Sequence, residues 1–219
     1  MADYKKPDHW QQKARKEGYP ARSVYKLKEI EEKFNLFKAP RVSLQGKSSL
    51  RVLDIGAAPG SWSLYVLRKA ADGALNNLFL AAADLSPLSR EFDSDSRNHG
   101  LFESDNFFFV QGDVTSPGIR EIILSKGPYS LIISDAAPST TGNHITDSAR
   151  SLELAETVIA YAENALVRGG NLALKIFQGS GVDALLKKMK TLFNAAKSFK
   201  PEACRGESVE TYYTGLGKK

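Results

Sequence analysis

LRVLDIGAAPGSW, residues 50–62, joins an apolar run to a glycine-containing loop and to the start of a second apolar segment. Leu50–Ile55 has the length and the aliphatic content of a buried strand, and Trp62–Ala71 has the period of a helix. Gly56 and Gly60 allow the backbone of the loop to approach a ligand closely. The stretch therefore predicts a strand, a ligand-binding loop and a helix in succession, with the ligand at the carboxyl end of the strand.

Apolar runs and helical periods alternate through the rest of the chain. Further strands are expected at 78–83, 107–110, 131–135 and 171–177, and further helices at 24–35, 119–125, 149–167 and 182–193. Ser23 is the expected N-cap of the first of these helices. The stretch 198–216 is expected to give two terminal strands, while 40–49 and 86–105 are expected to be loops. The predicted fold class is α/β, with a mostly parallel sheet of seven strands and helices on both faces.

The chain has the length and composition of one globular domain, because 42% of its 219 residues are hydrophobic and 25% are charged. Cys204 is the only cysteine, which excludes an intramolecular disulfide and a cysteine-rich zinc site and favours a reducing compartment. No apolar run reaches the roughly 20 residues needed to span a bilayer, and the charged N-terminus lacks the apolar core of a signal peptide. We therefore expect a cytoplasmic protein with a basic, loosely ordered segment at 1–20 and a single domain at 21–219.

The net charge of +5 is concentrated at the N-terminus. Residues 1–28 contain eight basic and three acidic residues, so the rest of the chain is neutral overall. Four aromatic residues lie in the same segment, namely Tyr4, Trp10, Tyr19 and Tyr25. Positive charge with interleaved aromatic rings is typical of contact with nucleic-acid phosphates and bases. The segment therefore favours a nucleic-acid partner, against the alternative of a solvated tail that aids solubility.

Three acidic side chains follow successive predicted strands, at Asp84, Asp113 and Asp135. The carboxyl ends of parallel strands meet at one edge of a sheet, where Asp84 could accept hydrogen bonds from ribose hydroxyls and the region of Asp113 could hold an adenine amine. The loop at 56–60 has neither the Gly-x-Gly-x-x-Gly spacing of dinucleotide folds nor the Gly-Lys-Ser/Thr of a phosphate loop. The predicted crevice therefore suits S-adenosylmethionine better than NAD.

Lys175 interrupts the apolar run Leu172–Phe177, which otherwise has the character of a buried strand. Burial of an unpaired lysine is costly, so such a residue either reaches water at the end of the strand or serves as a chemical group. The first alternative is the commoner one for a lone lysine. Partners from other segments of the chain decide between the two.

A family resemblance rests on five segments: Arg22–Leu27, Asp54–Trp62, Ser134–Ser139, Lys175–Gly179 and Glu207–Tyr212. Together they resemble the FtsJ/RrmJ (RlmE) family of RNA ribose 2′-O-methyltransferases, and the resemblance covers residues 20–215. It implies a Rossmann-like, S-adenosylmethionine-dependent methyltransferase fold, with residues 21–219 as the catalytic domain.

The resemblance implies four catalytic residues, which are Lys26, Asp135, Lys175 and Glu210. It implies cofactor contacts from Gly60, Trp62, Asp84, Asp113 and Asp135, to which the loop adds Gly56. No metal is implied. Lys175 would act on a ribose 2′-hydroxyl either as a neutral general base or as a cation beside the developing alkoxide. Lys26 would steer the hydroxyl or contact a phosphate, and Glu210 would hold one of the two lysines.

The expected reaction is transfer of a methyl group from S-adenosylmethionine to a ribose 2′-hydroxyl of structured RNA, with a uridine in large-subunit ribosomal RNA as the favoured target. Three alternatives stay open: transfer RNA as substrate, an RNA-binding assembly factor with a dormant methyltransferase fold, and a nicotinamide-dependent oxidoreductase. A monomer is favoured. The chain departs from the family in two places, because Ser61 replaces the second glycine of a Pro-Gly-Gly-Trp motif and the 86–105 loop is longer than in compact bacterial members.

Overall fold

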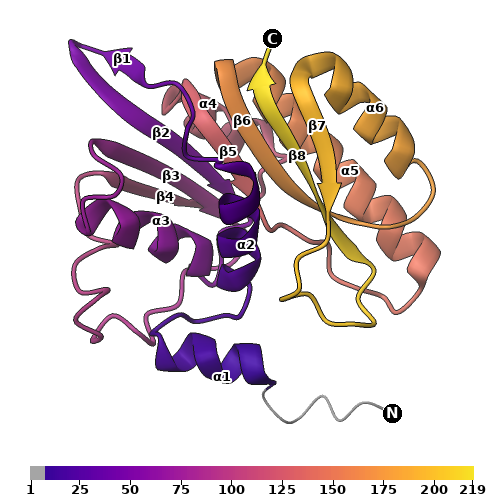
Figure 1. Ribbon diagram of the computed structural model, residues 1–219, viewed down its shortest axis with the longest axis horizontal. Coiled ribbons are helices and arrows are strands. Elements are labelled where there is room, and N and C mark those ends of the chain that lie inside the picture. The colour runs from indigo at the N-terminus through magenta and orange to yellow at the C-terminus, as the bar shows by residue number, and fades with distance from the viewer. Residues whose placement is uncertain (1–7) are drawn as a thin grey trace.

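A twisted sheet forms the centre of the molecule, for which the computed structural model describes residues 8–219 (Figure 1). Its strands are β1 Val42–Leu44, β2 Lys47–Ile55, β3 Leu78–Asp84, β4 Phe107–Gln111, β5 Tyr129–Ser134, β6 Leu166–Phe177, β7 Phe193–Phe199 and β8 Glu210–Lys218. The order is β4-β3-β2-β5-β6-β8-β7, with β1 paired to β2. The strands from β4 to β6 are parallel, and β8 is antiparallel to β6 and β7. The α/β class and the mostly parallel sheet are confirmed, and β1 adds a strand to the predicted seven.

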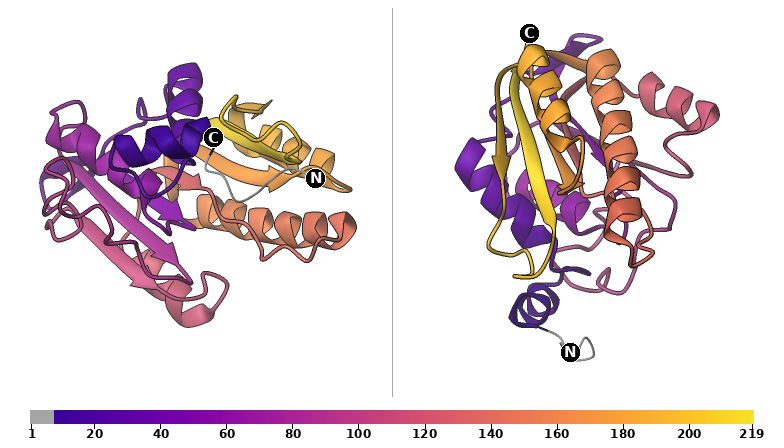
Figure 2. Two further views of the ribbon diagram at one scale, coloured as in Figure 1. Left: turned by 90° about the horizontal axis from the view of Figure 1, so that it is seen from below. Right: turned by 90° about the vertical axis from the view of Figure 1, so that its right-hand side faces the viewer.

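Helices cover both faces of the sheet, as predicted (Figure 2). They are α1 His9–Lys16, α2 Val24–Phe34, α3 Ser61–Ala71, α4 Pro117–Ser125, α5 His144–Ala165 and α6 Val182–Leu192. Consecutive strand residues pack on opposite faces, since Val52 belongs to the core under α2 and α3, whereas Leu53 belongs to the core under α4, α5 and α6. Among the helices of residues 8–219, none combines the length and the apolar character that a membrane span requires.

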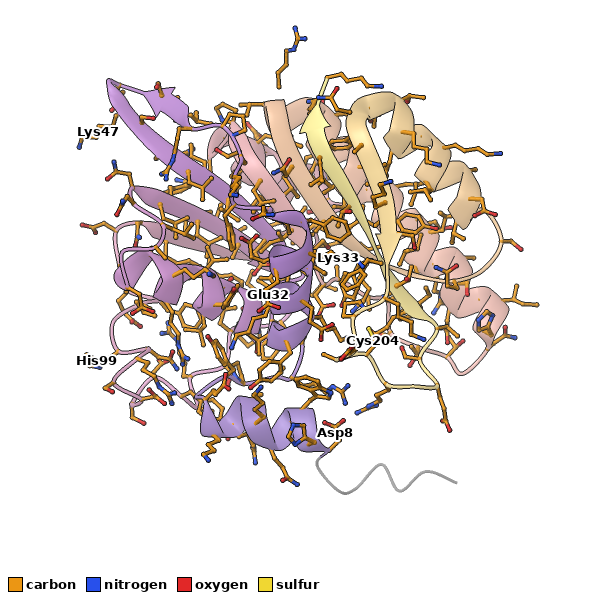
Figure 3. All side chains as sticks on the ribbon, viewed as in Figure 1. Asp8, Glu32, Lys33, Lys47, His99 and Cys204 are labelled. Carbon is orange, nitrogen blue, oxygen red and sulfur yellow. The ribbon has the colours of Figure 1, made fainter. Side chains whose placement is uncertain are left out.

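The region 40–49 contains a β-hairpin rather than the predicted loop. β1 pairs with β2 in antiparallel fashion, with Leu44 opposite Lys47. The two turn residues, Gln45 and Gly46, have φ values of 50° and 77°. A turn with positive φ at both central residues matches the twist of paired strands, so the hairpin extends β2 beyond its predicted start at Leu50. Figure 3 shows Lys47 near the tip of this hairpin, far from α1.

The prediction of a loosely ordered segment at 1–20 is wrong for residues 8–20, while residues 1–7 lie outside the described part of the chain. The Asp8 carboxylate caps α1 by accepting a hydrogen bond from the amide of Gln11 at 2.9 Å. Ala14 and Tyr19 are buried in the core under α2 and α3. An N-cap and two buried side chains therefore hold the segment, and Gly18, with a positive φ, follows the end of the helix.

Two helices differ from prediction at their N-termini, one in its capping and one in its first residue. α2 begins after Ser23 as expected, but the Ser23 side chain makes no capping hydrogen bond, and its carbonyl oxygen instead accepts from the indole nitrogen of Trp62 at 2.8 Å. α5 begins at His144, ahead of the predicted 149, because the side chain of Asn143 accepts hydrogen bonds from the amides of Ile145 and Thr146. Both differences lie at the edge of the sheet that carries the candidate site.

Candidate active site

The carboxyl ends of the central strands surround a cavity of about 420 Å³. The chain passes from β2 outward to β3 and β4 and then returns to β5 on the other side of β2. The loops after β2 and β5 therefore diverge and leave a crevice, as in other open parallel sheets. The walls come from the segment Ala21–Ser23, the loop after β2, the ends of β3 and β4, and the loop after β5, with Lys175 of β6. The volume lies in the range of small-molecule sites.

The predicted cofactor residues divide into two groups. Four of them line the cavity, namely Gly56, Asp84, Asp113 and Asp135. Gly60 packs against the ring of Phe102, and the buried side chain of Trp62 donates to the carbonyl oxygen of Ser23, which itself lines the cavity. Direct cofactor contact by Gly60 and Trp62 stays a prediction, and the structure places both residues behind the cavity wall.

Two of the carboxylates are fixed by the backbone around them. Asp84 accepts from the amide of Ala58 at 2.9 Å with one oxygen and from the amide of Ser86 at 2.8 Å with the other. Asp113 accepts from the hydroxyl and amide of Thr115, and these hydrogen bonds lower the pKa of the Asp113 carboxyl. Carboxylate oxygens have further lone pairs, so both residues can still accept from ribose hydroxyls or an amine.

The residues present fit S-adenosylmethionine. Acceptors at Asp84 and Asp113 suit the hydroxyls and amine of a nucleoside, and the apolar side chains of Leu85 and Val114 stand beside them in the wall. The loop after β2 contains no lysine that would hold a pyrophosphate. Within residues 8–219, no three histidine, cysteine or carboxylate side chains are placed so that they could hold a metal ion.

Gly56 brings the loop after β2 into contact with the loop after β5. Its φ is +77°, and a Cβ there would lie 2.5 Å from the Cα and Cβ of Ala136. Gly46, in the β1–β2 turn, has the same φ of +77° but nothing within 4 Å. The two glycines therefore share a backbone conformation and differ in the space around them.

We expect Gly56→Ala to lower the melting temperature more than Gly46→Ala and to weaken binding of S-adenosylhomocysteine. Gly46→Ala should cost only the left-handed conformation, about 1–2 kcal/mol. Gly56→Ala adds a backbone overlap that must push the two loops apart. Thermal unfolding and calorimetric titration of both variants check this, and equal melting temperatures with unchanged binding would contradict it.

Strand register brings Asp135 and Lys175 together. β5 and β6 run parallel with Ser134 opposite Leu174, so the next residues along the two segments lie side by side. Lys175 Nζ lies 3.1 Å from Asp135 Oδ1 and donates to the carbonyl oxygen of Asp135 at 2.6 Å. Lys175 is therefore paired with the Asp135 carboxylate. This pairing offsets the cost of removing the charge of the lysine from water.

Lys26 and Glu210 form a second ion pair from distant parts of the chain. Lys26 Nζ, on α2, lies 2.8 Å from both carboxylate oxygens of Glu210, the first residue of β8. In the antiparallel pairing of β6 with β8, Phe177 lies opposite Glu210 and Lys175 opposite Tyr212, so Glu210 is at the same sheet end as Lys175. The structure thus gathers the four predicted catalytic residues at one end of the sheet, with every side chain at most 16% exposed.

Tyr212 links the two ion pairs. Its hydroxyl donates to Asp135 Oδ1 at 2.6 Å, and Lys26 Nζ lies 5.9 Å from the centre of its ring. The ring of Trp62 packs at 6.0 Å on the same residue. Tyr212 is not among the predicted site residues, although its position two residues after Glu210 in a strand places both on one face of the sheet.

The charge of Asp135 is set by its neighbours. Burial alone would raise the pKa of the Asp135 carboxyl, but the charges of Lys175 and Lys26 and the hydrogen bond from Tyr212 hold the pKa below its ordinary value. Asp135 is therefore a carboxylate at neutral pH and holds Lys175 by charge as well as by geometry. Arg22 also lines the cavity and is likewise not among the predicted site residues.

Asp54 lies in β2 just before the glycine loop and is completely buried. Its Oδ2 accepts from the hydroxyl of Ser63 at 2.7 Å, while Oδ1 has no hydrogen-bond partner among the described residues. Burial, together with the charges of Asp135 and Asp84, raises the pKa of Asp54 to about 7. Asp54 therefore gains a proton on folding in weakly acidic solution.

Asp54→Asn should flatten the pH dependence of stability between about pH 4 and pH 7. The folded pKa of Asp54 lies above the unfolded value of about 3.9, so the folded wild type binds a proton in this interval that the unfolded chain does not bind. This contribution to the free energy of unfolding is complete below the unfolded pKa and is lost as the pH rises through the folded pKa. Urea unfolding at several pH values checks it, and parallel profiles of variant and wild type would contradict it.

The sheet order, the glycine loop and the carboxylates at the strand ends define a Rossmann-like methyltransferase that uses S-adenosylmethionine. Two solved structures share the fold. A chain described as a ribosomal RNA methyltransferase from Plasmodium falciparum gives a TM-score of 0.68 at 24% identity, covering 91% of this chain and 98% of that one. Human methyltransferase-like protein 13, in complex with SAH, gives a TM-score of 0.50 at 16% identity, covering 77% of this chain and 72% of that one.

The FtsJ-like methyltransferase family matches residues 19–218, and the chain belongs to this family. Among its relatives is the ribosomal RNA large subunit methyltransferase E of Treponema denticola, which is 45% identical over 99% of this chain and 97% of its own length. The protein of the same name from Oleidesulfovibrio alaskensis is 44% identical over 97% of this chain and 92% of its own length. Membership excludes the alternative of a nicotinamide-dependent oxidoreductase.

Proposed function

We propose that this protein transfers a methyl group from S-adenosylmethionine to a ribose 2′-hydroxyl of large-subunit ribosomal RNA, with a uridine as the target nucleoside. The observation that carries the proposal is the position of Lys175, which lies in the wall of the cofactor cavity and is held there by Asp135. The names of the relatives from Treponema denticola and Oleidesulfovibrio alaskensis support ribosomal RNA as the substrate.

The bound cofactor would supply a methyl group on a positively charged sulfur, which is already a good electrophile. The protein then has to align the hydroxyl with that methyl group, exclude water and manage one proton. Asp84 and Asp113 are the residues that would hold the nucleoside. Lys175 is the residue that would meet the hydroxyl, because it is the lysine in the cavity wall.

Lys175 has two oxygen partners, both on Asp135, and two roles use this arrangement. A neutral amine would direct its two N–H groups to these oxygens and keep its lone pair for the hydroxyl proton. An ammonium would keep a third N–H group to stabilise the oxygen as negative charge develops. The pH dependence of single-turnover methyl transfer separates the roles: the rate rises with pH if the neutral amine is required, and falls at high pH if the ammonium is required.

The ion pair of Lys26 with Glu210 supports the pair of Lys175 with Asp135. Glu210 holds Lys26 so that its charge stays close to Asp135, and Lys26 would steer the hydroxyl or contact an RNA phosphate. Residues 21–219 would form the catalytic domain, and α1 with α2 would form one wall of the RNA groove. We further propose that the protein acts as a monomer in the cytoplasm.

Methyl transfer from tritiated S-adenosylmethionine to unmodified RNAs tests the substrate. We expect labelling of large-subunit ribosomal RNA or of large ribosomal subunits, with little labelling of small-subunit RNA or transfer RNA. Preferential labelling of transfer RNA would replace the proposed substrate. Calorimetry with S-adenosylhomocysteine that shows no binding, together with no labelling of any RNA, would favour a dormant methyltransferase fold.

A further inference from the structure

The loop 86–105 contains no helix or strand, yet one of its side chains is buried like a core residue. Asn98 is 2% exposed. Its side-chain oxygen accepts from Arg68 Nε at 2.7 Å, and its side-chain nitrogen donates to the carbonyl oxygens of Gly18 at 2.9 Å and Phe92 at 3.0 Å. Asn98 therefore joins the loop to α3 and to the chain that follows α1.

Arg68 completes the connection from α3. Its guanidinium donates to the carbonyl oxygens of Glu17 at 2.8 Å and Gly18 at 2.9 Å, and lies 4.0 Å from the ring centre of Tyr19. Gly18 is in the left-handed region at φ +72°, and a Cβ there would lie 2.4 Å from a carboxylate oxygen of Asp95. The loop, α3 and residues 17–19 are thus packed as one unit, and a larger residue at Gly18 would have to displace the Asp95 side chain.

The segment fixed in this way is the N-terminal arm, which we define as residues 8–23. At its far end, Ala21–Ser23 lines the cofactor cavity, and the amide of Ala21 donates to the hydroxyl of Ser61 at 2.8 Å. At its beginning, Asp8 forms an ion pair with Arg22. Figure 3 shows Asp8 at one end of α1, while His99, the neighbour of Asn98 in sequence, lies toward the other. The arm is therefore held at both ends of α1.

The exposed face of the arm is basic. Lys13, Arg15 and Lys16 of α1 are exposed to solvent. The partner of Arg15 is Glu91, at 2.9 Å, in a pair whose side chains are 57% and 53% exposed. Such an exposed pair contributes little to stability, so an RNA phosphate can displace Glu91. The three cations are presented from a helix whose position depends on the loop.

We propose that the loop 86–105 is a brace that fixes the N-terminal arm for RNA binding, and that Asn98 is the positioning residue through which it acts. The proposal rests on the proposed function, since it takes the RNA phosphates to meet Lys13, Arg15 and Lys16. It assigns a role to a loop that contains no helix or strand and that was not given one by the sequence. Asn98 is buried and is not among the residues that line the cofactor cavity, so it would act on RNA only through the arm.

Asn98→Asp tests the brace, because it keeps the acceptor for Arg68 and removes both donated hydrogen bonds. The matched control is Ser96→Asp, which adds the same charge at an exposed position of the same loop. We expect Asn98→Asp to raise the Kd and the KM for large-subunit RNA by about three- to tenfold, the factor that corresponds to the net contribution of one hydrogen bond. The kcat and the affinity for S-adenosylhomocysteine should stay unchanged, and hydrogen exchange of α1 amides should accelerate.

A loss of global stability alone would lower the active fraction without raising KM, so the split between KM and kcat separates positioning from folding. Asn98→Ser removes the same donated bonds without adding charge and should reproduce the effect. Unchanged RNA affinity in both variants, or failure of both to fold, would overturn the brace. RNA binding and RNA methylation are measured separately. A wild-type protein that binds RNA without methylating it would therefore refute the proposed function and leave the brace standing.

Discussion

Methyl transfer by a Lys175→Met variant should be slower than that of the wild type by a factor of about 10²–10⁴, the usual contribution of a positioned group that handles a proton. Methionine keeps an unbranched side chain, with sulfur in place of the δ carbon of lysine, and lacks the nitrogen that lies against Asp135. The carboxylate keeps its hydrogen bond from Tyr212 and the nearby charge of Lys26, so the site should remain folded. Single-turnover rates at saturating cofactor measure the effect.

Lys187→Met is the matched control, because Lys187 is an exposed residue of α6. This helix covers the face of the sheet opposite to α2 and α3. It should leave the rate unchanged. Binding of S-adenosylhomocysteine to Lys175→Met should stay within a few-fold of wild type, which would place the loss in the reaction itself. A Lys175→Met enzyme that transfers methyl groups at the wild-type rate would remove Lys175 from the mechanism.

Asp135→Asn should lower both the rate and the affinity for the cofactor, with a combined loss in kcat/KM of about 10²–10³, as for removal of one preorganised charged contact. Asp135 lines the cavity and also holds Lys175, so the two losses have one origin. Asparagine still accepts from Tyr212 but no longer balances the charge of the lysine. Asp105→Asn, at an exposed position, serves as the control and should change neither quantity.

The same variant has a second expected signature at low pH. The pKa of Asp135 is lower in the folded protein than in the unfolded chain, so its carboxylate contributes stability above the unfolded pKa, and this contribution is lost as the pH falls through the folded pKa. Asp135→Asn should therefore lose less stability than the wild type on acidification. Identical acid unfolding of the two proteins would contradict the charge pairing.

The sequence indicates the elements of the catalytic sheet because its strands are apolar runs separated by helical periods. It also places Asp84, Asp113 and Asp135 at one sheet edge, since parallel strands end together. The contact of Lys26 with Glu210 could not be derived from spacing, because it depends on how α2 packs beside β8. Only the match of whole motifs anticipated it.

The predictions for residues 8–20 and 40–49 are wrong for local reasons. The helix α1 was missed because its support comes from tertiary burial of Ala14 and from a cap at Asp8, while the nearby breaker Gly18 is conspicuous in the sequence. The hairpin at 42–55 was missed because its turn, Gln45-Gly46, sits in a polar stretch. The role of Asn98 could not be predicted for a similar reason, because a polar residue in a loop gives no sign of burial until the fold brings Gly18 and Arg68 to it.

The chemical position of the transferred methyl group tests the central claim most directly. A methyl group on the 2′-oxygen blocks attack on the neighbouring phosphate, so the adjacent linkage survives alkali. After reaction of large-subunit RNA with tritiated S-adenosylmethionine and complete alkaline hydrolysis, the label should appear in resistant dinucleotides. Label recovered in mononucleotides would show methylation of a base and would contradict the mechanism built on Lys175 and Asp135.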